Sequence, residues 1–228
     1  MARTGEMIEF RVNGGTAPGY LARPASGTGP GLVVLQEWWG LVDHIKDVVD
    51  RFAAEGFVAL APDLYRGDST TNPDDAGRKM MALDIAQAGN DVAAAVEHRR
   101  GLGAVSPKKV ATMGFCMGGQ LALQAAVEHG DTVTAAVDFY GIHPNVSLDF
   151  GKLKVPVLAH FGKSDEFVNK EAAAKLVADI EAAGGRIEPH HYDAGHAFFN
   201  DARPEAFHAE SAATAKDRTL AFLRTHLA

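Results

Sequence analysis

A single cysteine lies in a segment typical of a tight strand-to-helix turn. Cys116 belongs to Gly114-Phe115-Cys116-Met117-Gly118-Gly119, between the apolar run 110–115 and a helix expected to begin near Gln120. Glycines two residues either side of a nucleophile relieve the crowding of such a strained turn. At a helix N-terminus the dipole and free N–H groups favour a thiolate, and the N–H of Met117 is placed to bind an oxyanion. These features predict a nucleophile; the alternative is an inert, buried thiol.

An acid and a histidine follow the cysteine in the order that a nucleophile of this kind requires. Asp165 comes just after the apolar run 155–161, and His196 lies in the loop after the run 186–192. Both are expected at the carboxyl edge of a parallel sheet, where Cys116 would also lie. The three residue types match a nucleophile, a base and a carboxylate that orients the base. The alternatives are a helix-capping aspartate and an ordinary loop histidine, one of ten in the chain.

The elements that must position these residues alternate between apolar strand-like runs and stretches with helical periodicity. Strands are predicted at 7–12, 19–22, 31–36, 57–61, 110–115, 132–140, 155–161 and 186–192. Helices are predicted from about 45 to 56, from Asp74 or Asp75 through Val96, over 173–180, and at the C-terminus around Leu220 to Leu227. This pattern predicts an α/β fold with a mainly parallel central sheet flanked by helices on both faces. No repeat or linker divides it, so residues 1–228 are expected to form a single domain.

The composition of the chain limits the classes of molecule that we expect it to bind. The net charge of −7 and the pI near 5.8 disfavour a nucleic acid or an anionic membrane as partner. The sequence has no run of 18 apolar residues and no apolar signal core, and one cysteine cannot form an internal disulfide, so a cytoplasmic location is expected. His190 and His191 are adjacent in a strand and would point to opposite faces, so no metal site is expected. We expect a monomer or a small homo-oligomer that acts on a small molecule.

Five motifs in order resemble the dienelactone hydrolase family, whose members are cysteine enzymes of the α/β-hydrolase fold, and the resemblance covers nearly the whole chain. The motifs are Gln36-Glu37-Trp38-Trp39-Gly40, Ala61-Pro62-Asp63-Leu64-Tyr65, Gly114-Phe115-Cys116-Met117-Gly118-Gly119, Gly162-Lys163-Ser164-Asp165 and Ala194-Gly195-His196-Ala197-Phe198. The resemblance implies a carboxymethylenebutenolidase-like hydrolase with Cys116, Asp165 and His196 as its triad and with no cofactor.

The resemblance also implies a role for Glu37. In the family, the glutamate of this motif holds and deprotonates the resting thiol until substrate arrives. Glu37 follows the strand 31–36 at its carboxyl end, where a partly dry carboxylate could take the thiol proton. The alternative is a structural salt-bridge residue. The backbone N–H of Trp38 would then be the second oxyanion donor beside Met117.

The sequence departs from the best-known family members at the positions of two arginines, which in those enzymes hold the carboxylate of the substrate. Asn200 stands four residues after His196, where one arginine is expected, and the loop 70–75 that should contain the other has none. Arg78 is the nearest arginine to that loop. Asn200 cannot form the two-pronged, charge-assisted contact of arginine.

The aromatic residues near these motifs indicate a different character for the substrate site. Trp38, Trp39, Phe198 and Phe199 predict an apolar, aromatic-walled site, or else core packing. The candidates for substrate contact are therefore Arg78, Asn200, Trp39 and Phe198.

The predicted function is hydrolysis of a small ester or lactone through a thioester on Cys116. A glutaminase-like cysteine protein is a second possibility, but such proteins use a histidine and a glutamate close together downstream. A ligand-binding or regulatory module that kept the hydrolase scaffold without turnover is a third. The presence of all three triad residues argues against that third reading.

Overall fold

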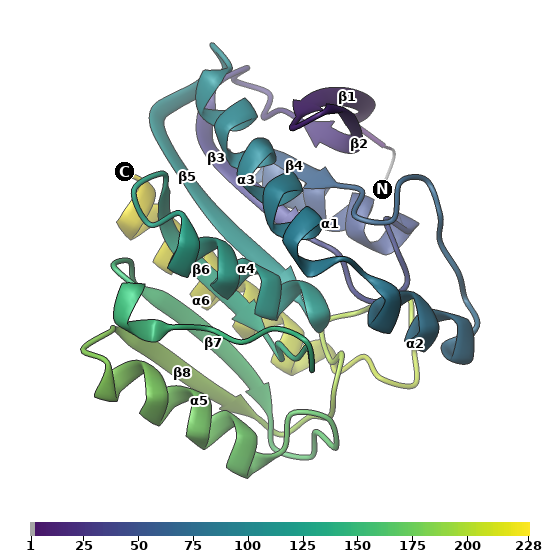
Figure 1. The fold of residues 1–228 in the computed structure, drawn as a ribbon, viewed down its shortest axis with the longest axis vertical. Helices are drawn as coiled ribbons and strands as arrows, with labels where there is room; N and C mark the ends of the chain where they lie inside the picture. Colours follow the sequence, from purple (N-terminus) through teal and green to yellow (C-terminus); the bar gives the residue numbers. More distant parts are fainter. Residues whose placement is uncertain (1–2) are drawn as a thin grey trace.

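An eight-stranded sheet contains every segment that the sequence predicts to be a strand (Figure 1). The computed structural model describes residues 3–228. Its strands are β1 (Glu6–Val12), β2 (Gly15–Ala22), β3 (Gly29–Leu35), β4 (Val58–Pro62), β5 (Val105–Phe115), β6 (Val133–Phe139), β7 (Val157–Gly162) and β8 (Ile187–Tyr192). They are ordered β1-β2-β4-β3-β5-β6-β7-β8. The hairpin β1–β2 is antiparallel and joins β4 in antiparallel fashion, whereas β3 to β8 are parallel to one another.

Helices cover both faces of the sheet. They are α1 (Asp43–Ala54), α2 (Pro73–Ala82), α3 (Ile85–Gly101), α4 (Met117–Glu128), α5 (Lys170–Ala182) and α6 (Ala209–Leu227), with a short 3₁₀ turn at Phe150–Lys152. α3 and α4 lie in front of the sheet in Figure 1, and α6 lies behind it. The predicted α/β-hydrolase architecture is therefore confirmed. No helix within residues 3–228 is long and apolar enough to cross a membrane.

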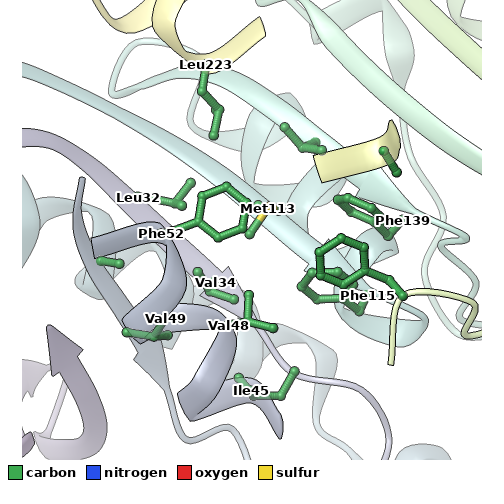
Figure 2. Packing of buried hydrophobic residues seen from close by; sticks show 14 of the residues in the cluster. Leu32, Val34, Ile45, Val48, Val49, Phe52, Met113, Phe115, Phe139 and Leu223 are labelled. Atoms are coloured by element: carbon green, nitrogen blue, oxygen red, sulfur yellow. The ribbon is translucent and has the colours of Figure 1, made fainter. Parts of the chain in front are cut away.

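The two faces of the central strands form two separate cores because neighbouring residues of a strand point to opposite sides. On β3, Leu32 and Val34 pack against α1 and α6, whereas Val33 and Leu35 pack against α3 and α4. Figure 2 shows the first of these cores, in which Phe52 of α1 lies among side chains from β3 and β5. Full burial of each such side chain stabilises the fold by about 1.5–3 kcal/mol, and this anchors the carboxyl ends of β3 and β5.

One predicted helix is wrong in its extent. The helix expected from Asp74 or Asp75 through Val96 is two helices, α2 and α3, which are separated at Leu83 and Asp84. The Asp84 side chain accepts a hydrogen bond from the N–H of Gln87 at 3.0 Å and so caps α3. A short polar side chain that binds the backbone in this way ends one helix and begins the next.

Two further boundaries differ from expectation. α2 begins at Pro73, one residue before the expected Asp74 or Asp75, and its N-cap is Asn72, whose side chain accepts from the N–H of Asp75. α4 begins at Met117 and not near Gln120, because Cys116 itself occupies the N-cap position. The cysteine therefore lies directly at the N-terminus of a helix.

Candidate active site

Cys116 lies in a strained turn between β5 and α4, which we call the cysteine turn (residues 114–119). Its φ is 53° and its ψ −124°, a backbone conformation that side-chain-bearing residues rarely adopt. A Cβ at Gly114 would overlap the carbonyl of Gly118, and one at Gly118 would lie 2.5 Å from the carbonyl oxygen of Gln36. Both glycines are therefore required by close backbone approach, as the sequence predicts.

The backbone of Cys116 is held by the strand next to β5. Its N–H donates to the carbonyl of Phe139 at 3.0 Å, and its own carbonyl accepts from Gly119 at 2.9 Å and from Ile142 at 3.2 Å. The cysteine is 8% exposed. These three hydrogen bonds therefore fix the backbone that carries the sulfur.

Asp165 and His196 come from neighbouring loops and bind each other. Nδ1 of His196 lies 2.8 Å from Oδ2 of Asp165, and the aspartate side chain is completely buried. Oδ1 of the same carboxylate accepts from the N–H groups of Phe167 and Val168, each at 2.8 Å. Burial would raise the pKa of Asp165, but the hydrogen bonds from His196 and these two N–H groups hold it below its usual range. The carboxylate therefore stays ionised and keeps the imidazole in one orientation.

His196 also faces the sulfur of Cys116. Burial would lower the pKa of His196, but the contacts with Asp165 and with Cys116 outweigh burial and raise it to about 10. An imidazole in this environment is protonated at neutral pH. The arrangement can therefore hold an imidazolium beside a thiolate, the charge state in which a cysteine attacks a carbonyl group.

Cys116 and His196 both line a cavity of about 530 Å³, which we call the Cys116 cavity. Its lining is mainly apolar and consists of Glu37, Trp38, Trp39, Pro73, Met80, Cys116, Ile142, Pro144, Phe167, His196, Ala197, Arg203 and Ala206. The ring of Phe167 lies 4.9 Å from that of His196, measured between centroids. A volume of this size is typical of small-molecule sites.

Glu37 lies at the wall of this cavity and is 2% exposed. Its Oε2 accepts a hydrogen bond from Nδ2 of Asn200 at 2.6 Å, and its Oε1 is buried without a partner among the described residues. The structure thus places Asn200 against Glu37 and not in the wall of the Cys116 cavity.

Two other residues predicted to contact substrate lie elsewhere. Arg78 is on the outer side of α2, where its side chain is 73% exposed and pairs with Asp75 at 3.3 Å. Phe198 is completely buried and packs between Tyr140 and Tyr192. Phe198 is therefore a core residue, because Ala197 has a φ of 59° and turns the chain inward immediately after His196.

The two predicted oxyanion donors lie at the ends of adjacent strands. Met117 is the first residue of α4, where a backbone N–H has no intrahelical acceptor. Trp38 and Trp39 follow β3 and both line the Cys116 cavity. β3 and β5 are paired in parallel, so the backbones of Trp38 and Met117 approach from neighbouring strands. Within residues 3–228 no group of three or more histidine, cysteine or acidic side chains is arranged to hold a metal ion.

Arg203 lines the cavity and was missed by sequence reasoning. Its guanidinium lies 4.5 Å from the centroid of the Trp39 ring and pairs with Glu205 at 2.6 Å. It stands in the loop that follows His196, three residues beyond the offset at which the family places its arginine. A search of that whole loop for a cation, without a fixed offset, would have found it.

A second buried carboxylate lies behind the cysteine turn. Asp138 of β6 is fully buried, and a side chain at either Gly119 or Gly141 would overlap its Oδ1. Burial raises its pKa to about 7, and neither of its carboxylate oxygens has a hydrogen-bond partner among the described residues. Asp138 therefore packs directly against the first turn of α4.

The chain is similar to known proteins in sequence and in fold. The model of the dienelactone hydrolase family matches residues 17–227. The chain is 38% identical to "Protein usf" of Aquifex pyrophilus, over 98% of this chain and 99% of that protein. It is 34% identical to the carboxymethylenebutenolidase of a Pseudomonas species, over 92% and 91% of the two chains. The crystal structure of a dienelactone hydrolase-like promiscuous phosphotriesterase from metagenomic libraries has the same fold, with a TM-score of 0.87 over 99% of both chains at 24% identity.

Proposed function

Because the chain belongs to the dienelactone hydrolase family and is a carboxymethylenebutenolidase-like hydrolase, we propose that it opens a small lactone or ester with Cys116 as the nucleophile. One observation carries this proposal. Cys116 and His196 line the same cavity, and Asp165 binds the far nitrogen of the imidazole at 2.8 Å. A nucleophile, a base and a carboxylate that orients the base are the three groups that acyl transfer of this kind requires.

In the first half of the reaction, the Cys116 thiolate attacks the carbonyl carbon and the carbonyl electron pair moves onto oxygen. The N–H groups of Met117 and Trp38 stabilise that oxyanion. When it collapses, the carbon–oxygen bond of the ester breaks and the leaving oxygen takes a proton from His196. The product of this half is a thioester on Cys116.

In the second half, water attacks the thioester carbonyl while His196 accepts its proton. The carbon–sulfur bond then breaks, which releases the carboxylic acid and restores Cys116. Asp165 stabilises the imidazolium that forms in each half and prevents the ring from turning. No step requires a cofactor.

In the resting enzyme, we propose that the Glu37 carboxylate accepts a hydrogen bond from the Cys116 thiol. Its Oε1 is buried without a partner among the described residues and belongs to the cavity that also contains Cys116. A thiol can satisfy that oxygen, and the carboxylate can in turn take the proton. The sulfur is protected while the thiol keeps its proton, and transfer of that proton to Glu37 frees the thiolate when substrate occupies the cavity.

The cavity wall indicates the substrate class. Trp38, Trp39 and Phe167 form apolar walls that suit a small ring or a short acyl chain. Arg203 adds a positive charge to this wall, and its guanidinium suits a carboxylate on the substrate. We therefore propose a small lactone or ester, with acidic lactones favoured over neutral ones.

The assignment of the nucleophile is tested with Cys116→Ala and Cys116→Ser on p-nitrophenyl acetate. We expect kcat/KM to fall by about a thousandfold or more, because alanine has no nucleophile and a serine hydroxyl ionises much less readily than a thiol. Mass spectrometry should find an acetyl group on the wild-type protein and none on Cys116→Ala. Thermal melts establish that both variants fold.

Near-normal turnover by Cys116→Ala would overturn the assignment. Since the chain has one cysteine, iodoacetamide provides a matched control without mutation: one adduct per chain should abolish activity. If a panel of esters and lactones shows no thiol-dependent hydrolysis, the chain is a binding module on a hydrolase scaffold.

A further inference from the structure

The contact between Glu37 and Asn200 joins two segments that are 163 residues apart. Both side chains are 2% exposed, and the 2.6 Å distance from Nδ2 to Oε2 is short for a hydrogen bond between an amide and a carboxylate. Asn200 lies in the loop that follows His196, and Glu37 lies at the end of β3. A buried hydrogen bond of this kind couples the loop carrying the proposed base to the carboxylate near the nucleophile.

Local contacts determine which way the Asn200 amide faces. Its Oδ1 accepts from the N–H of Ala202 at 3.1 Å, and its backbone N–H donates to the carbonyl of Ala197 at 2.9 Å. Because the amide oxygen is used by a backbone donor, only the NH₂ group remains to face Glu37. The NH₂ group of Asn200 is therefore directed toward Glu37 by its own loop, and it donates to Oε2 of the carboxylate.

A neutral donor has a different consequence from a cation at this position. An arginine would neutralise the carboxylate and bind both of its oxygens. Asn200 is uncharged and binds only Oε2, so it brings no positive charge to Glu37 and leaves Oε1 without a partner among the described residues. A buried oxygen of this kind costs free energy unless another donor reaches it.

We infer that Asn200 is a positioning residue that holds the Glu37 carboxylate with its Oε1 available to the Cys116 thiol. This inference rests on the proposed function, in which Cys116 is the nucleophile. Glu37 is among the charges that raise the pKa of the buried Tyr140 hydroxyl, after burial itself, and Cys116, His196 and Arg203 line the same cavity as Glu37. Asn200 differs from these groups because its side chain donates a hydrogen bond to Glu37.

The test measures how fast iodoacetamide alkylates Cys116 as a function of pH, in wild type, Glu37→Gln, Asn200→Leu and the double variant. Cys116 is the chain's one cysteine, so each rate reports on this thiol alone. A nearby anion disfavours a thiolate, so Glu37→Gln should shift the midpoint of the profile to lower pH by about half a unit or more. Asn200→Leu should shift it in the same direction, because a buried carboxylate that loses its donor takes up a proton.

The double variant provides the decisive comparison. If Asn200 acts through Glu37, the double variant shifts the midpoint no further than Glu37→Gln alone, because the two substitutions affect one interaction. Additive shifts would overturn the inference, as would a wild-type midpoint in Asn200→Leu. Asn90→Leu is the matched control, because Asn90 is exposed on α3, and its midpoint should equal that of wild type.

Further outcomes separate this inference from the proposed function. Asn200→Ala serves if Asn200→Leu does not fold, because it removes the donor without adding apolar bulk. If Cys116→Ala abolishes turnover but Asn200→Ala and Asn200→Leu both keep the wild-type profile, the proposed function stands and the role of Asn200 is refuted. If Cys116→Ala retains turnover, the proposed function itself is refuted, whatever the alkylation profiles show.

Discussion

Replacement of Asp165 by asparagine tests how the histidine is oriented. Oδ1 of Asp165 accepts two backbone hydrogen bonds, from Phe167 and Val168, and Oδ2 accepts from Nδ1 of His196. An asparagine can satisfy the two backbone N–H groups only with its oxygen, so its NH₂ group must face the imidazole. Nδ1 then becomes an acceptor, and the ring proton moves to Nε2, the nitrogen that should receive the proton from Cys116 or from water.

The expected loss of activity follows from this change of tautomer. The base is present but carries its proton on the wrong nitrogen, so we expect kcat/KM to fall by about 10²–10⁴-fold, or roughly 3–5 kcal/mol of transition-state stabilisation. The pKa of His196 is raised to about 10, with the contact to Asp165 among the causes. In the wild type the imidazolium is therefore lost only as the pH rises through about 10. In Asp165→Asn this loss should occur at a lower pH.

The assay is steady-state hydrolysis of p-nitrophenyl acetate from pH 6 to the alkaline limit of the substrate, with thermal melts to establish folding. Asp193→Asn is the matched control: this aspartate precedes His196 by three residues, and its 86% exposed side chain pairs with Lys163. An exposed ion pair contributes little, so the control should retain activity within about twofold. If Asp165→Asn folds and its kcat/KM stays within about threefold of wild type, Asp165 does not orient the base.

Two further substitutions test the charges around the site. Arg203→Gln should reduce kcat/KM about tenfold or more for lactones that carry a carboxylate, because these lose a charge-assisted contact. Neutral lactones make no such contact, so their kcat/KM should not change. Equal losses for both kinds of lactone in a paired substrate screen would refute a charge-based role. Asp138→Asn should change how stability depends on pH. Because burial raises the pKa of Asp138 to about 7, the folded wild type retains a proton that the unfolded chain releases near pH 4, and stability is lost as the pH rises through about 7. Asparagine is always neutral, so between these pH values the free energy of unfolding of the variant should rise relative to wild type by up to about 1.4 kcal/mol per pH unit, as measured by urea denaturation. If the free energies of unfolding of the two proteins change in parallel with pH, the pKa of Asp138 is not raised.

The parts of the site that were predictable from the sequence are those with local causes. The glycines at 114 and 118 are needed by backbone contacts within a few residues of Cys116 or with the adjacent strand end, so their spacing alone indicates the turn. The positions of Asp165 and His196 follow from where β7 and β8 end, because parallel strands bring their carboxyl ends to one edge. The roles of these residues in catalysis stay predictions until they are tested by mutation.

The helix break at Leu83 shows where periodicity is insufficient. The apolar residues at 81, 85, 88, 92 and 96 keep a helical spacing across the break, so the pattern favours one helix. The Asp84 side chain decides otherwise, through a hydrogen bond that competes with the helical backbone. The sequence contains this capping aspartate, but whether it breaks the helix depends on the difference in free energy between one continuous helix and two capped ones.

The directions of side chains in the loop after His196 depended on the folded structure as a whole. Residues 197–208 have no strand or helix period, so the sequence gives no rule for which side chain faces the cavity. The positive φ of Ala197 turns Phe198 into the core, Asn200 meets a glutamate from the end of β3, and Arg203 reaches Trp39. Each of these contacts joins segments that are far apart along the chain and form only when the sheet brings them together. Local sterics therefore specify the nucleophile and the strand ends, whereas long-range packing specifies what surrounds the substrate.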